Sequence, residues 1–208
     1  MLVSISDGEA SLVNEKATDY FRELAELLPS IEVTDQRGAT LSLDAGAKKA
    51  VEMILSLQPA SGKVMLIGNG GSAAIASHMQ NDLCKAVRSR AIIFNEAPLL
   101  MALSNDDGYG CVFERPVELW ADRGDLLLAI SSSGRSENIL RGVQAAAKKG
   151  CRVITFSGFA PDNPLRRMGD VNFYVPLQVY GYVEVAHQAL GHFMTDSAMA
   201  RTKAGKTD

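Results

Sequence analysis

Val64-Met-Leu-Ile-Gly-Asn-Gly-Gly-Ser72 and Leu126-Leu-Leu-Ala-Ile-Ser-Ser-Ser-Gly-Arg-Ser136 are the two stretches that decide the fold. In each, a short apolar run predicts a buried strand, and the glycines and serines after it predict a tight turn. The run Leu126–Ile130 has no polar alternation, which is typical of a central strand that helices cover on both faces. Each stretch is therefore interpreted as a strand–turn–helix unit of a parallel α/β fold.

The rest of the chain after Gly62 repeats this alternation. Apolar runs predict five strands, and helical patterns follow from about Ser72, Pro98, Ser136 and Gly181. The predicted strands cover residues 63–68, 91–95, 125–131, 152–157 and 171–176. Strand–helix alternation of this length predicts a doubly wound, mainly parallel five-stranded sheet flanked by helices, of the flavodoxin-like type.

Residues 1–60 differ from this pattern and are predicted to form a helical extension. Apolar residues recur at helical spacing over residues 8–28 and 43–57, and the polar segment 32–40 between them is predicted to be a loop. These helices are expected to pack on the α/β domain or on a neighbouring subunit. The α/β domain is assigned to residues 61–200, and the polar residues 201–208 are expected to be a frayed tail.

Composition limits the possible functions. The 208 residues are 47% hydrophobic and 22% charged, and the net charge of −3 gives no electrostatic footprint for nucleic acid or an anionic membrane. Cys84, Cys111 and Cys151 are far apart and form no metal-binding pair. No basic N-terminal segment or apolar run of about 20 residues is present, so a cytoplasmic protein is expected.

Both turns offer the chemistry of an anion site. Backbone N–H groups at a helix N-terminus, together with serine hydroxyls, make a neutral cradle for a phosphate. The predicted ligand-binding residues are Asn69, Gly70, Gly71, Ser72, Ser131, Ser132, Ser133 and Ser136. Arg135 either adds charge to the second turn or is solvated.

Two other phosphate-binding classes fit poorly. The first turn lacks the third glycine of a dinucleotide fingerprint, and Glu96 is a weak candidate for the acidic residue that such proteins place after the second strand. A Walker lysine is also absent, which argues against cleavage of a nucleoside triphosphate.

The two turns, with the strand Gly150-Cys-Arg-Val-Ile-Thr-Phe-Ser-Gly158, resemble the SIS domain and, within it, the phosphoheptose isomerase family. The resemblance covers about residues 64–193. It implies an aldose–ketose isomerase that converts sedoheptulose 7-phosphate to D-glycero-D-manno-heptose 7-phosphate through an enediol. It also implies a homotetramer with sites completed by neighbouring subunits.

The resemblance further implies a metal site, with zinc or another divalent transition metal as its ion. Its ligands would be His78 and Asp82 on one helix and Glu184 and His192 on another. Residues four apart on a helix lie about 40° apart around its axis, so His78 and Asp82 share a face. The family has glutamate in place of Asp82 and glutamine in place of Glu184. The two acids here are therefore interpreted as a redistribution of carboxylates rather than a loss.

The roles that follow are expectations for this chain. Asp82 or Glu184 would be the base, and His192 would deliver a proton on the other side. Asn105 and Asp106 resemble a substrate-contacting segment, although a helix-ending loop would have the same composition. His187 lies about 140° from His192 on the predicted helix and is interpreted as structural. The alternative function is a non-catalytic SIS module that binds a sugar phosphate for regulation or as an adaptor.

Overall fold

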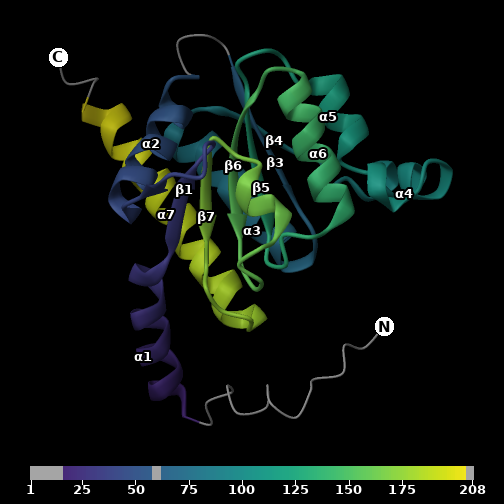
Figure 1. Cartoon of the computed structure of the whole chain (residues 1–208). Coiled ribbons are helices and arrows are strands. Elements are labelled where there is room, and N and C mark those ends of the chain that lie inside the picture. The colour runs from purple at the N-terminus through teal and green to yellow at the C-terminus, as the bar shows by residue number, and fades with distance from the viewer. Residues whose placement is uncertain (1–15, 58–61, 205–208) are drawn as a thin grey trace, which may run out of the picture.

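The structure, a computed structural model, describes residues 16–57 and 62–204. Its centre is a seven-stranded sheet in the order β2-β1-β7-β6-β5-β3-β4 (Figure 1). Five of these strands are parallel to one another: β3 (Lys63–Gly68), β4 (Arg90–Ile93), β5 (Leu126–Ser131), β6 (Arg152–Ser157) and β7 (Val171–Tyr174). The predicted doubly wound, mainly parallel sheet is confirmed.

The strand order fixes where a ligand can bind. The chain runs from β3 outward to the edge strand β4 and then returns to β5 on the other side of β3. The reversal leaves a crevice beyond the carboxyl ends of β3 and β5, which is where open α/β sheets bind their ligands. Both glycine- and serine-rich turns follow these two strands.

The predicted number of strands was too small, because the segment expected to be a loop at residues 32–40 extends the sheet. It forms β1 (Glu32–Asp35) and β2 (Thr40–Leu41), joined by a turn in which Gly38 has φ of 79°. Strand β1 is antiparallel to both of its neighbours, β2 on one side and β7 on the other. Only Val33 of β1 is buried, so the sequence of this edge hairpin lacks the apolar run that marks an interior strand.

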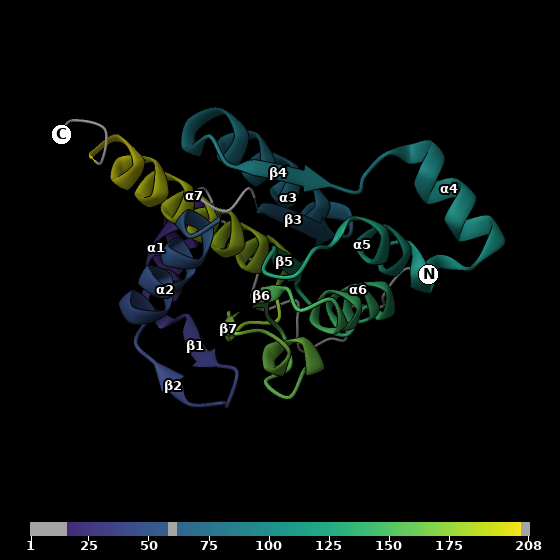
Figure 2. The same ribbon diagram turned by 90° about the horizontal axis from the view of Figure 1, so that it is seen from above.

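Helices cover the sheet on both faces (Figure 2). One face packs against α2 (Leu43–Leu55), α3 (Gly70–Asp82) and α7 (Tyr180–Ala204). The other packs against α5 (Glu114–Trp120) and α6 (Glu137–Lys148). Alternate residues of β5 point to opposite cores: Leu126 and Leu128 join the first cluster, and Leu127 joins the second. This explains why β5 is apolar from Leu126 to Ile130.

The N-terminal extension contains two helices, as predicted, and the two differ from each other in burial. Helix α2 is part of the main core, with Ala50, Val51 and Ile54 buried. Helix α1 (Ala17–Leu27) has no buried residue and extends away from the body of the protein (Figure 1). It contacts α7 where the rings of Tyr20 and Tyr182 lie 4.2 Å apart. The predicted residues 8–15 of this helix and the predicted boundary near residue 60 lie outside the described residues.

The remaining elements are short except for α7. Helix α4 (Ala97–Asp106) has no buried residue and projects from the domain (Figure 2). Helix α7 continues through Ala204, so it includes the first half of the segment expected to be a frayed tail. Short helical turns complete the fold at Leu28–Ser30, Leu83–Val87, Tyr109–Cys111 and Pro164–Arg167. Among the described residues, every helix is too short or too polar to cross a membrane.

His187 ties α7 to the sheet. Its ring is fully buried, Nε2 lies 3.2 Å from the carbonyl oxygen of Ser157, and the ring lies beside Phe156. Burial lowers the pKa of His187 to about 4, because the charged imidazolium would lose its hydration. The position agrees with the structural role expected from the sequence.

This burial predicts an acid-sensitive contribution to stability. Because the pKa of His187 is lower in the folded state, the unfolded chain binds the extra proton first, and stability falls as pH drops below the unfolded pKa of about 6.5. When the pH falls from 7.5 to 5, this histidine should lower the free energy of unfolding by about 2 kcal/mol. Urea unfolding of the natural chain and of a His187→Leu variant measures it: the variant should lose about 2 kcal/mol less over that interval. Equal losses would contradict the assignment.

Candidate functional site

A polar pocket of about 230 Å³ lies in the crevice beyond β3 and β5. Eight of its lining residues are the ones that the two turns were predicted to contribute: Asn69, Gly70, Gly71, Ser72, Ser131, Ser132, Ser133 and Ser136. Helix α7 adds Tyr180 and Glu184. The structure therefore brings both turns and one of the predicted acids into a single pocket.

The serine turn after β5 has the form of an anion cradle. Ser136 is the N-cap residue of α6, so the free N–H groups of that helix open toward the turn. The hydroxyl of Ser132 is buried and has no hydrogen-bond partner among the described residues. A buried hydroxyl without a partner is costly. The turn is therefore arranged to receive a hydrogen-bonding ligand.

None of the described residues that line this pocket is cationic. Arg135 points to Asp162 instead, with Nη2 2.6 Å from Oδ1, and both side chains are exposed. Of the two roles considered for Arg135, the structure supports the surface one. Recognition of an anion in the pocket depends on hydroxyls and backbone N–H groups.

A reciprocal amide pair joins the two turns. The Nδ2 group of Asn69 donates to Oδ1 of Asn138 over 2.9 Å, and the Nδ2 group of Asn138 donates back over 2.8 Å. The hydroxyl of Tyr109 also donates to Oδ1 of Asn69, over 3.0 Å. Asn138 is buried in the first turn of α6. The pair fixes the start of α3 against the start of α6, which sets the width of the pocket.

The glycines of the first turn have different reasons for being glycine. A Cβ on Gly68 would lie 2.6 Å from the carbonyl oxygen of Ser72, so the turn can close only with glycine there. Gly70 has φ of 50°, which glycine adopts at little cost. A Cβ on Gly71 would lie 2.5 Å from Cδ of Glu184. The carboxylate of Glu184 therefore lies directly against the first turn of α3.

A group of potential metal ligands lies farther along α3 and α7. His78, Asp82 and His192 place one ligand atom each within 4.8 Å of one another. Oδ2 of Asp82 lies 3.5 Å from Nε2 of His78 and 3.6 Å from Nδ1 of His192. Two imidazoles and a carboxylate are a donor set that suits zinc and other divalent transition metals. These three side chains could hold a metal ion.

Glu184, the fourth expected ligand, is not part of this group. Its carboxylate is in the polar pocket, and among the described residues it has no hydrogen-bond or ion-pair partner. Glu184 and His192 are eight residues apart on α7, which corresponds to about 12 Å along the helix axis. The two acids that the resemblance placed together therefore have different surroundings: Asp82 lies between two histidines, and Glu184 lies in the wall of the serine pocket, against Gly71.

Asn105 and Asp106 do not line the pocket. They end the projecting helix α4, both are exposed, and Nδ2 of Asn105 donates to Oδ1 of Asp106 over 2.8 Å. Within one chain, the structure does not bring them to the other predicted substrate-binding residues.

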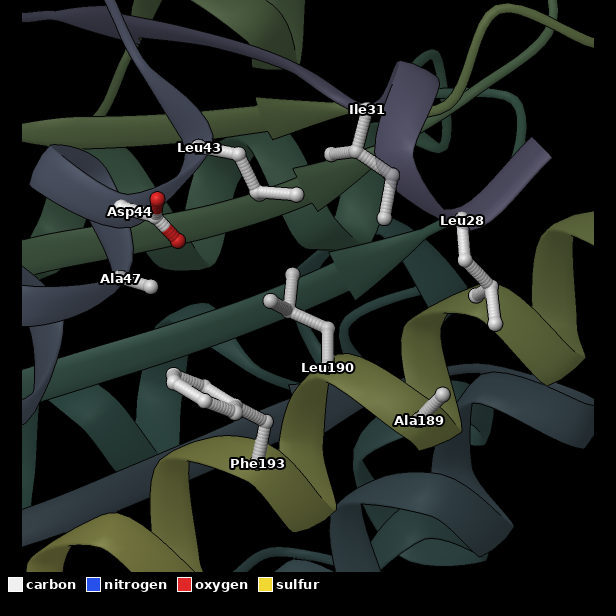
Figure 3. Close-up of a pocket in the computed structure, with 8 residues that line it drawn as sticks. All are labelled: Leu28, Ile31, Leu43, Asp44, Ala47, Ala189, Leu190 and Phe193. Carbon is white, nitrogen blue, oxygen red and sulfur yellow. The ribbon is translucent and has the colours of Figure 1, made fainter. Parts of the chain in front are cut away.

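A second hollow, of about 220 Å³, lies between α2 and α7 and has a different character (Figure 3). Of the described residues that line it, Asp44 alone is charged, and the rest are apolar: Leu28, Ile31, Leu43, Ala47, Ala189, Leu190 and Phe193. None of the predicted site residues lines it. Because a phosphorylated sugar needs hydrogen-bond partners, the serine pocket is the better candidate.

Sequence reasoning missed three polar residues of this region. Tyr180 lines the pocket, and Asn138 and Tyr109 hold Asn69 in place. The only signal for Asn138 was its place in the first turn of the helix that follows the serines. Tyr109 is 40 positions from Asn69, and no local pattern relates them.

Comparison with known proteins agrees with this architecture. Residues 19–158 match the family model described as the SIS domain. The chain is 31% identical to the phosphoheptose isomerase of Syntrophotalea carbinolica over 186 residues, which are 85% of this chain and 89% of that protein. It is 38% identical to the phosphoheptose isomerase of Sodalis glossinidius over 140 residues, covering 65% of this chain and 71% of that protein.

Solved structures show the same relationship. The phosphoheptose isomerase of Neisseria gonorrhoeae superposes with a TM-score of 0.76 at 27% identity, covering 87% of this chain and 95% of that one. The phosphoheptose isomerase of Francisella tularensis also superposes with a TM-score of 0.76, at 26% identity, covering 88% of this chain and 96% of that one. The fold and the two turns thus define a SIS-domain protein. More narrowly, the chain belongs to the phosphoheptose isomerase family, and it is an enzyme of the isomerase class.

The glycines of the first turn give a matched pair of mutations. Gly71→Ala should leave stability unchanged or raise it by up to about 1 kcal/mol, because alanine favours a helix and the obstructing Glu184 carboxylate is the end of a flexible side chain. Gly68→Ala should cost more than about 2 kcal/mol, because its methyl group meets backbone atoms of Ser72 and Ala73. Thermal and urea unfolding of both variants measure the difference. Equal effects would show that the turn is not packed as described.

Proposed function

We propose that the protein is an aldose–ketose isomerase that converts sedoheptulose 7-phosphate to D-glycero-D-manno-heptose 7-phosphate through an enediol. The observation that carries this proposal is the single pocket that combines the serine turn with a carboxylate, Glu184. Family membership supports it, because curated relatives with 31% to 38% identity are phosphoheptose isomerases.

The phosphate would bind at the serine turn. Hydroxyls of Ser131, Ser132, Ser133 and Ser136, together with N–H groups at the start of α6, would donate to its oxygens. Ser72 would contribute from the other turn, while Asn69, Gly70 and Gly71 would contact the sugar chain. Glu184 repels the phosphate electrostatically, which favours the serine end of the pocket for the phosphate and the Glu184 end for the sugar carbons.

The metal would be zinc or another divalent transition metal, bound by His78, Asp82 and His192. The ligand atoms of these residues are close enough to share one ion, and their chemistry fits it. A bound divalent cation supplies polarisation of a substrate oxygen in this kind of reaction. Asp82, Glu184 and His192 are the candidate proton-transfer groups: one acid takes the proton next to the carbonyl, and either His192 or the same acid returns a proton to the neighbouring carbon.

We also propose that the enzyme is a cytoplasmic homotetramer whose sites are completed by neighbouring subunits. Asn105 and Asp106 would contact substrate only from a second chain, since α4 projects away from its own pocket. Apolar side chains that are exposed in one chain support association: Met101, Leu119, Trp120, Phe21 and Phe193. Light scattering that returned the 22.3 kDa mass of a single chain would contradict this part of the proposal.

The activity has a direct test. Purified, zinc-loaded enzyme should interconvert sedoheptulose 7-phosphate and the aldoheptose phosphate, and removal of metal with EDTA should abolish this until zinc is restored. His78→Ala should weaken zinc binding by more than about 100-fold, because losing a ligand exceeds the 10- to 100-fold cost of losing a supporting contact. Asp196→Asn, an exposed acid on α7, is the control and should bind zinc normally.

The proposal fails if metal-loaded enzyme turns over neither heptose phosphate. A chain that binds the sugar phosphate without converting it would instead indicate a regulatory or adaptor role.

A further inference from the structure

We infer that Glu184, on α7, is the catalytic base of this enzyme, and that Asp82, on α3, serves to hold the two histidines. The inference rests on the proposed isomerase function and assigns the proton transfer within it. Of the two acids expected as alternative bases, it selects Glu184, on the last helix of the fold, rather than Asp82, on the helix after the first turn.

Asp82 is engaged by its neighbours. Its Oδ2 lies within 3.6 Å of a nitrogen of both His78 and His192, whose rings are 4.8 Å apart in an edge-on arrangement. It does not line the serine pocket. Gly71 and Asp82 are separated by 11 positions on α3, or about 16 Å along the axis, and an aspartate side chain is too short to cover much of that distance. Asp82 is therefore placed to orient imidazoles or hold a metal rather than to reach a sugar among the serines.

Glu184 has the opposite surroundings. It is half-buried in the wall of the serine pocket, where its carboxylate lies against Gly71. Among the described residues it accepts no hydrogen bond and forms no ion pair, so both oxygens are available to a ligand. A general base must come within hydrogen-bond reach of the proton it removes. Glu184 is the only carboxylate among the described residues that line this pocket.

The pocket also fixes which end of the substrate meets Glu184. With the phosphate on the serine turn, the carbon chain extends away from Ser131–Ser136 toward the α3–α7 side, where Glu184 lies. Electrostatic repulsion between the phosphate and Glu184 works against the reverse orientation. The carbonyl end of the sugar is thus directed to the carboxylate.

The reaction is redox-neutral overall and needs no co-reactant. Glu184 takes a proton from C1 of the ketose, the C1–H electron pair forms the C1=C2 double bond, and the C2 carbonyl oxygen gains a proton from water. The resulting enediol loses the proton of its C1 hydroxyl to water as the C1=O bond forms, and C2 receives the proton that Glu184 carries. One carboxylate, that of Glu184, therefore moves the hydrogen from C1 to C2. Because Glu184 exchanges its proton with solvent while the enediol is bound, hydrogen from solvent also becomes attached to these carbons.

Solvent exchange tests this assignment separately from the overall activity. In deuterium oxide, zinc-loaded enzyme should incorporate deuterium into sedoheptulose 7-phosphate. Glu184→Gln should slow both exchange and isomerisation by about 100- to 10,000-fold, while zinc content and affinity for the ketose phosphate stay within a few-fold of the natural enzyme. Asp82→Asn should lose zinc, and Asp196→Asn should match the natural enzyme in every measurement.

Chemical rescue distinguishes a reacting group from a structural one. Glu184→Ala leaves space for a small acid, so added formate should restore exchange in a concentration-dependent way, which loss of packing would not allow. Exchange by Glu184→Gln within a few-fold of the natural rate would overturn the assignment. So would an Asp82→Asn variant that binds zinc at saturating metal yet exchanges no deuterium. If the natural enzyme itself neither exchanges nor isomerises, the proposed function fails rather than the choice of base.

Discussion

The reciprocal amide pair of Asn69 and Asn138 is the contact on which the candidate site depends. It joins the turn after β3 to the helix after β5, and these strands are neighbours at the point where the strand order reverses. Buried amides without partners are costly, so each asparagine holds the other in place. With the two helix starts fixed in this way, serine hydroxyls and backbone N–H groups face one cavity, and a ligand need not order them on binding.

Helices α3 and α7 carry the rest of the chemistry because they run side by side in the same direction. Gly71 faces Glu184, Gly191 faces Met79, and Asp82 faces His192. The glycines permit the close approach, since a Cβ on Gly191 would lie 2.8 Å from the sulfur of Met79. One helix pair thus provides a carboxylate at the serine pocket and, about two turns farther along, a group able to hold a metal.

Much of this could be predicted from the sequence. The five parallel strands and the two turns were marked by local patterns, namely apolar runs and clusters of glycine and serine, whereas the meeting of His78 and His192 was expected only from the family resemblance. The hairpin β1–β2 was missed because an edge strand needs only one buried residue, Val33, to pair with β7. The resemblance placed Glu184 and His192 in one metal site, but it could not show that α3 contacts them at different levels of α7.

The remaining differences have the same origin, because they depend on contacts between distant segments. Asn138 and Tyr109 act on Asn69 from other elements, and no periodicity within either segment indicates it. Asn105 and Asp106 resemble a substrate-contacting segment of the family, yet they lie at the end of α4, outside the pocket of their own chain. The sequence predicted candidate site residues, whereas the packing of α3, α4 and α7 determines which of them lie close together.

The most direct test of the central claim is a crystal structure of the enzyme with sedoheptulose 7-phosphate bound. The account predicts phosphate density within hydrogen-bond distance of the hydroxyls of the Ser131–Ser136 turn, and a carbon chain that extends toward the carboxylate of Glu184. Phosphate bound away from the serine turn, or a sugar whose carbonyl end points away from Glu184, would contradict it.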